Sequence, residues 1–189
     1  MYKKTEQYAL NSPIFKVVNF FLENPYKEAH LRGIARELRI SPFSSKKFLD
    51  LLLKEGLITE KRRANLRYFK ANTLNLFFKH LKISFNIKKI LDSGLIDFLK
   101  DKIPALSSIT LFGSFAKGEN YGESDIDLVA IGKKIKLDIS GYKKILKREI
   151  TLYTFSQAEW KKQQIENKAF YQDVISHGTP LYGELPLLK

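Results

Sequence analysis

No cysteine occurs among the 189 residues, which excludes disulfide bonds and thiolate metal sites and is typical of an intracellular protein. No apolar run approaches the roughly 20 residues that a membrane-spanning helix needs. The N-terminal stretch MYKKTEQYALNSP lacks the apolar core of a signal peptide, and no Gly-x-Gly-x-x-Gly or Walker-type loop is present. These absences predict a soluble, cytoplasmic protein with no membrane partner.

Acidic residues are scarce relative to basic ones, and the imbalance is uneven along the chain. The formal net charge is +13 at pH 7. Residues 1–103 carry 21 Lys and Arg against 10 Asp and Glu, whereas residues 104–189 carry 12 against 10. A basic half joined to a nearly neutral half favours a polyanion-binding part and a separate second part. A generally lysine-rich composition would produce the same imbalance without any such partner.

The first half has the pattern of three helices followed by a hairpin. Ser12-Pro13 and Ser41-Pro42 each combine an N-cap with proline at the first helical position, and apolar residues then recur at helical spacing. The segment 27–40 repeats that spacing and is expected to form the helix between them. Residues 57–63 and 66–71 change to the pattern of two strands joined by a short turn.

This order of elements resembles the winged helix-turn-helix family of DNA-binding domains, over about residues 12–72. The resemblance implies that the third helix presents its first turn to the major groove and that the hairpin contacts phosphates or a minor groove. The residues expected to contact duplex DNA are Ser44, Ser45, Lys46, Lys47, Arg62, Arg63 and Arg67. The alternatives are a merely solvated basic surface and a winged helix that serves as a protein-contact module.

A helical connector is expected over residues 76–103. Its apolar stripe is interrupted by Gly94, at a cost of about 1 kcal/mol relative to alanine. The connector could pack on either neighbouring part or mediate self-association into a homo-oligomer. The expected organisation is therefore an α+β winged helix-turn-helix domain (1–75), the connector (76–103) and a mixed α/β domain (104–189).

The stretch LFGSFAKGENYGESDIDLVAIG, residues 111–132, carries the chemistry. A strand is expected to end in a tight Gly113-Ser114 turn, followed later by a strand that is apolar on both faces and therefore buried. Asp125 and Asp127 alternate onto one face, where a divalent cation such as Mg²⁺ would relieve their mutual repulsion. Backbone N–H groups after the turn can hold phosphate, and Lys117 could reach it. A phosphate site facing a metal site predicts a nucleoside triphosphate ligand.

The Gly113-Ser114 pair, a ten-residue spacer and Asp125-Ile126-Asp127 resemble the DNA polymerase beta-like nucleotidyltransferase superfamily, over about residues 104–182. Neighbouring small residues are similar to its minimal nucleotidyltransferase branch, some members of which act as antitoxins or pair with a HEPN-type partner. The resemblance implies transfer of a nucleoside monophosphate to an acceptor, with Mg²⁺ bound by the two aspartates and the triphosphate at the Gly-Ser turn.

A third carboxylate completes the site in that superfamily, normally inside a later strand. The candidate strand here is residues 148–155, and its only acid is Glu149, at its start. If this strand pairs beside the Asp-x-Asp strand, Glu149 can face the two aspartates and is expected to be the third metal ligand and catalytic acid. Asp138 is the rival, and a surface ion pair of Glu149 with Lys147 or Arg148 is the structural alternative.

Two functions remain open at this point. The first is a Mg²⁺-dependent nucleotidyltransferase, coupled to a DNA-binding winged helix, that acts on an unknown acceptor such as a HEPN-type toxin or another protein. The second is a DNA-binding regulator or antitoxin whose transferase fold is inactive or senses nucleotide. The intact Asp125 and Asp127 favour the enzyme, whereas the lack of an obvious acceptor-binding domain favours the regulator.

Overall fold

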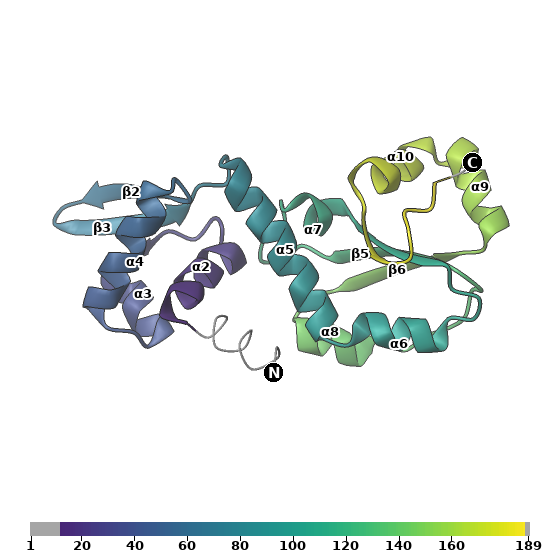
Figure 1. The fold of residues 1–189 in the computed structure, drawn as a ribbon, viewed down its shortest axis with the longest axis horizontal. Coiled ribbons are helices and arrows are strands. Elements are labelled where there is room, and N and C mark those ends of the chain that lie inside the picture. The colour runs from purple at the N-terminus through teal and green to yellow at the C-terminus, as the bar shows by residue number, and fades with distance from the viewer. Residues whose placement is uncertain (1–11, 188–189) are drawn as a thin grey trace. The chain divides into compact units, whose positions relative to one another are not determined.

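A computed structural model describes residues 12–187 and divides the chain into two compact units, Met1–Lys82 and Ile83–Lys189 (Figure 1). The boundary falls inside helix α5 (Leu76–Asp92). The expected functional division at residues 75 and 103 stays a prediction, because compactness does not test which segment carries which function.

The first unit consists of helices packed on a small antiparallel sheet. Its elements are α2 (Pro13–Glu23), β1 (Ala29–His30), α3 (Leu31–Leu38), α4 (Pro42–Lys54), β2 (Ile58–Arg63) and β3 (Leu66–Ala71), with strand order β1-β3-β2. Prolines at the first turns of α2 and α4 start those helices, with Ser12 and Ser41 as N-caps. The apolar helix faces and β3 form the core, which includes the fully buried Val17, Ile34, Leu49 and Phe69.

The start of the second helix differs from the expectation for residues 27–40. Ala29 and His30 form a two-residue strand that pairs with Phe69 and Tyr68, and α3 begins only at Leu31. His30 Nδ1 accepts a hydrogen bond from the Gly33 N–H at 3.0 Å, so the histidine acts as the N-cap. A strand of two residues leaves no detectable periodicity in the sequence.

The second unit contains the rest of α5, a four-stranded mixed sheet and its covering helices. The elements that follow α5 are α6 (Leu95–Lys102), β4 (Ser108–Phe112), α7 (Gly113–Lys117), β5 (Ile126–Ile131), α8 (Ser140–Leu146), β6 (Ile150–Phe155), α9 (Gln157–Glu166), α10 (Lys168–His177) and β7 (Thr179–Tyr182). The strand order is β6-β5-β4-β7. Strand β5 pairs parallel with β6 and antiparallel with β4, so the condition for Glu149 to face the aspartates, that the 148–155 strand lies beside the Asp-x-Asp strand, is met. Gly94 adopts φ +78 between α5 and α6 and so separates two helices instead of interrupting one.

The central strand β5 is buried on both faces. Leu128 packs into a core with α6 and α8, whereas Val129 packs into a second core with Trp160 of α9 and Val174 of α10. Figure 1 shows α6 and α8 on one side of the sheet and α9 and α10 on the other. Asp127 shares the face of Val129, because successive strand residues alternate. None of the helices within residues 12–187 has the length and apolar character needed to cross a membrane.

Candidate functional site

The Gly-Ser turn and the Asp-x-Asp segment meet where β4 ends and β5 begins. Phe112, the last residue of β4, is the register partner of Asp127 in β5. Gly113 follows with φ +68, and a Cβ atom placed there would lie 2.7 Å from Asp127 Oδ2. Glycine is therefore required twice over, by the left-handed backbone and by the closeness of the carboxylate. The register of β4 and β5 and the small space beside Gly113 thus place the two motifs next to each other.

Asp127 lies in a strongly negative environment. Partial burial, followed by the neighbouring carboxylates of Asp125 and Asp173, raises the pKa of Asp127 above its ordinary value. A divalent cation would remove both unfavourable effects, since it supplies positive charge and accepts hard oxygen ligands. The oxygen donors of Asp125 and Asp127 therefore fit Mg²⁺. Within the described residues 12–187, however, no group of three or more His, Asp or Glu side chains is gathered closely enough to hold a metal ion.

Asp173 is a site residue that the sequence analysis missed. It lies on α10, and its Oδ1 atom is 2.5 Å from Lys117 Nζ and 3.0 Å from His177 Nδ1. Burial would raise the pKa of Asp173, but the hydrogen bonds from Lys117 and His177 outweigh burial and lower it. Lys117, expected at the triphosphate, thus forms an ion pair with an acid that also acts on Asp127. No local motif marks Asp173, because only the packing of α10 against the sheet brings it there.

Glu149 lies immediately before β6, beside the start of β5. Its carbonyl oxygen accepts a hydrogen bond from the Ile126 N–H at 2.9 Å, so its backbone is next to the Asp-x-Asp segment. Its side chain is 68% exposed, and Oε2 lies 2.5 Å from Lys143 Nζ of α8. The ion pair is with Lys143 and not with Lys147 or Arg148, the residues considered in the sequence analysis. The rival Asp138 accepts a hydrogen bond from the Ser140 N–H at 2.9 Å, in the loop before α8.

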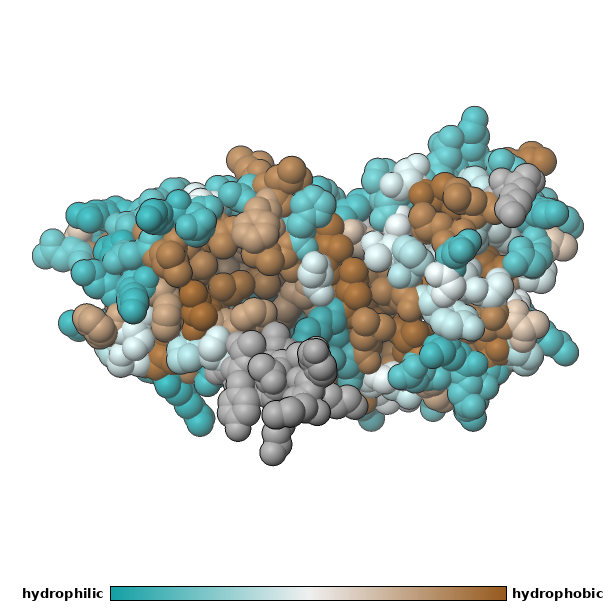
Figure 2. Space-filling view, viewed as in Figure 1, coloured by the Kyte–Doolittle hydropathy of each residue, from teal (hydrophilic) through white to brown (hydrophobic). Residues whose placement is uncertain are grey.

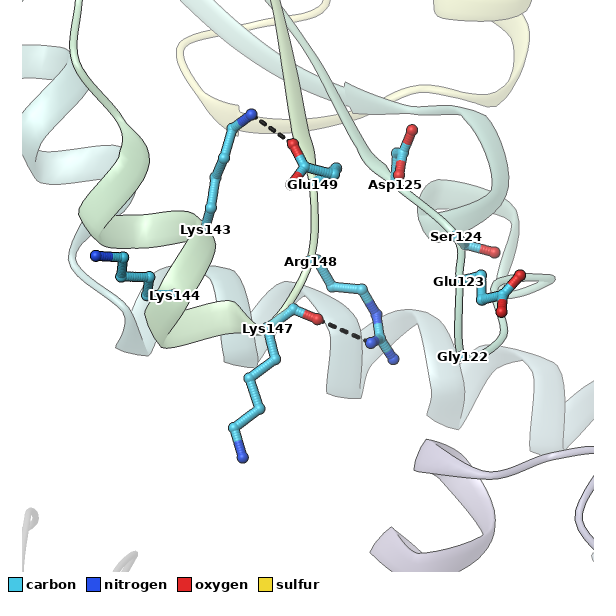
Figure 3. Close-up of a pocket in the computed structure, with 9 residues that line it drawn as sticks. All are labelled: Gly122, Glu123, Ser124, Asp125, Lys143, Lys144, Lys147, Arg148 and Glu149. Atoms are coloured by element: carbon cyan, nitrogen blue, oxygen red, sulfur yellow. Dashed lines mark hydrogen bonds and ion pairs between the residues drawn. The ribbon is translucent and has the colours of Figure 1, made fainter.

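A pocket of about 400 Å³ opens between residues 122–125 and residues 143–149 (Figure 3). One wall is the loop that leads into β5, and the other is the C-terminal part of α8 with the residues that follow it. The lining residues are Gly122, Glu123, Ser124, Asp125, Lys143, Lys144, Lys147, Arg148 and Glu149. Four basic residues and one of the two aspartates thus line the same pocket, although the ammonium ends of Lys144 and Lys147 point away from Asp125 (Figure 3).

The residues expected to contact DNA have different surroundings in the first unit. Lys46 and Lys47 of α4 are exposed and Ser44 is partly exposed, but Ser45 is fully buried and points into the protein. Burial prevents Ser45 from reaching a nucleic acid, so we remove it from the proposed surface. The N-cap Ser41 accepts a hydrogen bond from the Ser44 N–H at 3.0 Å.

The β2–β3 hairpin carries the remaining candidates, and its end is strongly hydrophilic (Figure 2). Arg62 and Arg63 are exposed and each forms an ion pair, with Glu60 at 3.1 Å and Glu28 at 2.9 Å respectively. Arg67 is only 23% exposed and lies 2.7 Å from both Asp50 and Glu60. The pair with Asp50 links the hairpin to α4, so Arg67 has a structural role whatever else it contacts.

Residues 92–172 match the family model described as "Nucleotidyltransferase domain". This region is a nucleotidyltransferase domain. The protein adenylyltransferase MntA of Shewanella oneidensis is 25% identical over 97 residues, which is 51% of this chain and 68% of that protein. The domain match and this relative together support a nucleotidyltransferase enzyme.

Several solved structures are also similar to parts of this chain. A crystal structure described as a toxin-antitoxin with AMP-PNP covers 52% of this chain and 74% of its own, with 25% identity and a TM-score of 0.37. The MntA-HpeT toxin-antitoxin mutant D39ED41E has 23% identity and a TM-score of 0.37, covering 48% of this chain and 71% of its own. NolR from Sinorhizobium fredii has 17% identity and a TM-score of 0.29 and covers 38% of this chain and 75% of its own.

Proposed function

We propose that the nucleotidyltransferase domain is a Mg²⁺-dependent enzyme that transfers a nucleoside monophosphate from a nucleoside triphosphate to a protein hydroxyl group. The observation that carries this proposal is the contact between the Gly-Ser turn and Asp127, beside Asp125. It brings a phosphate-binding turn within van der Waals range of a carboxylate that is suited to a cation. The similarity to a protein adenylyltransferase supports ATP as donor and a protein as acceptor.

Each residue of the site has a role in this proposal. Gly113 and Ser114 hold the triphosphate, and Lys117 leaves Asp173 to neutralise the phosphate charge. Asp125 and Asp127 hold Mg²⁺, which supplies charge neutralisation at the reacting phosphate when it is bound. The Glu149 carboxylate leaves Lys143, accepts a hydrogen bond from the attacking hydroxyl group and then takes the hydroxyl proton. The hydroxyl oxygen then forms the bond to the α-phosphorus while the bond to the bridging oxygen breaks and pyrophosphate leaves.

The experiment that tests this function is direct. The chain is incubated with MgCl₂ and ATP labelled at the α-phosphate, together with protein acceptors, and both labelled protein and pyrophosphate are measured. Transfer that needs Mg²⁺ and disappears in Asp125→Asn supports the proposal. Nucleotide binding that is equally tight without Mg²⁺ and in Asp125→Asn would contradict it, because a different site would then bind the nucleotide.

We further propose that the first unit is a winged helix-turn-helix domain that binds duplex DNA. The observation in favour is the order of elements, helix–strand–helix–helix–strand–strand, with exposed Lys46 and Lys47 on α4 and exposed Arg62 and Arg63 on the hairpin. The chain would then be a DNA-bound nucleotidyltransferase. If the transferase domain proves unable to transfer, the same DNA binding supports the alternative, a regulator or antitoxin that senses nucleotide.

A further inference from the structure

We propose that the pocket beside Asp125 holds an acidic segment of the acceptor protein while a neighbouring hydroxyl group of that protein attacks the nucleotide. The inference rests on the proposed function and assigns the acceptor's binding site and charge. It starts from the position of the pocket, which is lined by Asp125 and Glu149 and by no residue of the Gly113–Lys117 turn. In-line phosphoryl transfer requires the attacking oxygen to enter opposite the leaving pyrophosphate. We therefore place the acceptor in this pocket, because none of the residues of the proposed triphosphate site lines it.

The basic side chains of the pocket differ in how far they are neutralised. Lys143 is paired with Glu149, and Lys144 acts electrostatically on Asp138. Within residues 12–187, neither Lys147 nor Arg148 forms an ion pair with a carboxylate, and the one polar contact of the Arg148 side chain is from Nη1 to the Lys147 carbonyl oxygen at 2.9 Å. Figure 3 shows the Arg148 guanidinium reaching toward the Gly122–Glu123 wall. A guanidinium group with most of its donors unused is well suited to bind a carboxylate in a bidentate manner.

Among the described residues, Lys147 is the second basic lining residue without a carboxylate partner. It ends α8 in the left-handed conformation, with φ 53, as Arg39 does at the end of α3. Its side chain extends away from Asp125 in Figure 3, so it is placed to meet an acceptor at the outer part of the pocket. The observation that supports a role is therefore its unpaired charge at this position and not its backbone conformation.

The size and charge of the pocket favour a short acidic segment of a protein over a nucleic acid. A cavity of about 400 Å³ accommodates a few side chains. Its acidic lining residues are Glu123 and Asp125 on the loop wall and Glu149 beside the cations, and a continuous row of phosphates would meet them in like-charge contacts. Separate carboxylates can instead pair with Arg148 and Lys147 one at a time. Such a segment holds the attacking hydroxyl group near Glu149, which takes the hydroxyl proton as the new phosphorus–oxygen bond forms and pyrophosphate leaves.

The test uses the full chain, MgCl₂ and labelled ATP with three probes. The first is a peptide with a central tyrosine between glutamates, the second is the same peptide with glutamines, and the third is a single-stranded oligonucleotide with a free 3′ hydroxyl group. We expect kcat/KM for the glutamate peptide to exceed that for the glutamine peptide by about tenfold or more, as two charge-assisted contacts imply. The preference should fall as salt is raised, because the contacts are partly exposed.

The variant Lys147→Asn/Arg148→Gln should lose the preference for the glutamate peptide. Asparagine tolerates the backbone conformation of Lys147, so the fold is preserved and a melting curve checks this. The matched control is Lys161→Gln/Lys162→Gln, which removes the same charge from exposed positions on α9 and should keep the preference.

Equal rates for the two peptides, or a preference that survives in the pocket variant, would overturn the proposal. Extension of the oligonucleotide without labelling of either peptide would also overturn it and assign the pocket to nucleic acid. The proposed function is examined separately by calorimetric binding of a non-hydrolysable ATP analogue with Mg²⁺. If the analogue binds and both peptides are labelled at equal rates, the pocket assignment alone fails, whereas a lack of Mg²⁺-dependent analogue binding contradicts the proposed function itself.

Discussion

Replacing Gly113 by alanine probes the contact on which the proposed function depends. The substitution has two separable effects. The left-handed backbone costs an alanine about 1–2 kcal/mol, whatever space surrounds it. The added Cβ atom would also lie 2.7 Å from Asp127 Oδ2, so the carboxylate or the turn must move. A displacement of about 1 Å at a reacting centre can lower the rate about 100-fold.

Gly94→Ala is the matched control for the backbone effect. Gly94 has φ +78, and an added Cβ would have no atom within 4 Å. We expect both variants to melt at lower temperature, by about 2–4 °C for each kcal/mol lost. Only Gly113→Ala should lose transfer, by about 100-fold, with labelled ATP and the melting curve measured on the same preparations. Wild-type transfer by Gly113→Ala, or an equal loss in Gly94→Ala, would refute the reasoning.

Three further predictions concern charged side chains. Asp127→Asn should abolish transfer. Folding raises the pKa of Asp127, so the stability that this group contributes is present below its ordinary pKa and is lost as pH rises through the raised pKa. In metal-free melting curves between acid and neutral pH the variant should lack this loss of stability, and a pH profile identical to that of the wild type would contradict the prediction. Glu149→Gln should lower the transfer rate by orders of magnitude with nucleotide binding retained, and near wild-type turnover would remove Glu149 from the site. Arg62→Ala/Arg63→Ala in the full chain should reduce the slope of log affinity for duplex DNA against log salt by about 1 per residue, and an unchanged slope and affinity would exclude these arginines from DNA binding.

The sequence predicted the parts of the fold that have local signals. Serine–proline pairs marked the starts of α2 and α4, and alternation marked β2 and β3, because caps and periodicity are properties of neighbouring residues. The adjacency of the Gly-Ser turn and Asp127 was also predictable, since each motif is attached to an apolar strand and consecutive strands usually pair. Strand β1 was not predictable, because two residues have no period.

The third acid shows where such reasoning stops. Alternation along residues 148–155 placed Glu149 on the face of the aspartates, and the parallel register, with Thr151 opposite Asp127, agrees with that face. The direction of the Glu149 carboxylate was not predictable, because Lys143 competes for it from α8, a helix that strand periodicity does not describe. Asp173 was not predictable for the same reason: it comes from α10 and acts on Asp127 only through tertiary packing. Two lysines, Lys143 and Lys117, thus each hold an acid next to the Asp-x-Asp strand. A cation at Asp127 would attract the two acids, Glu149 and Asp173, and phosphate at the Gly-Ser turn would attract the two lysines. Substrate and metal together can therefore separate the two ion pairs and assemble a site that neither the substrate nor the metal would form alone.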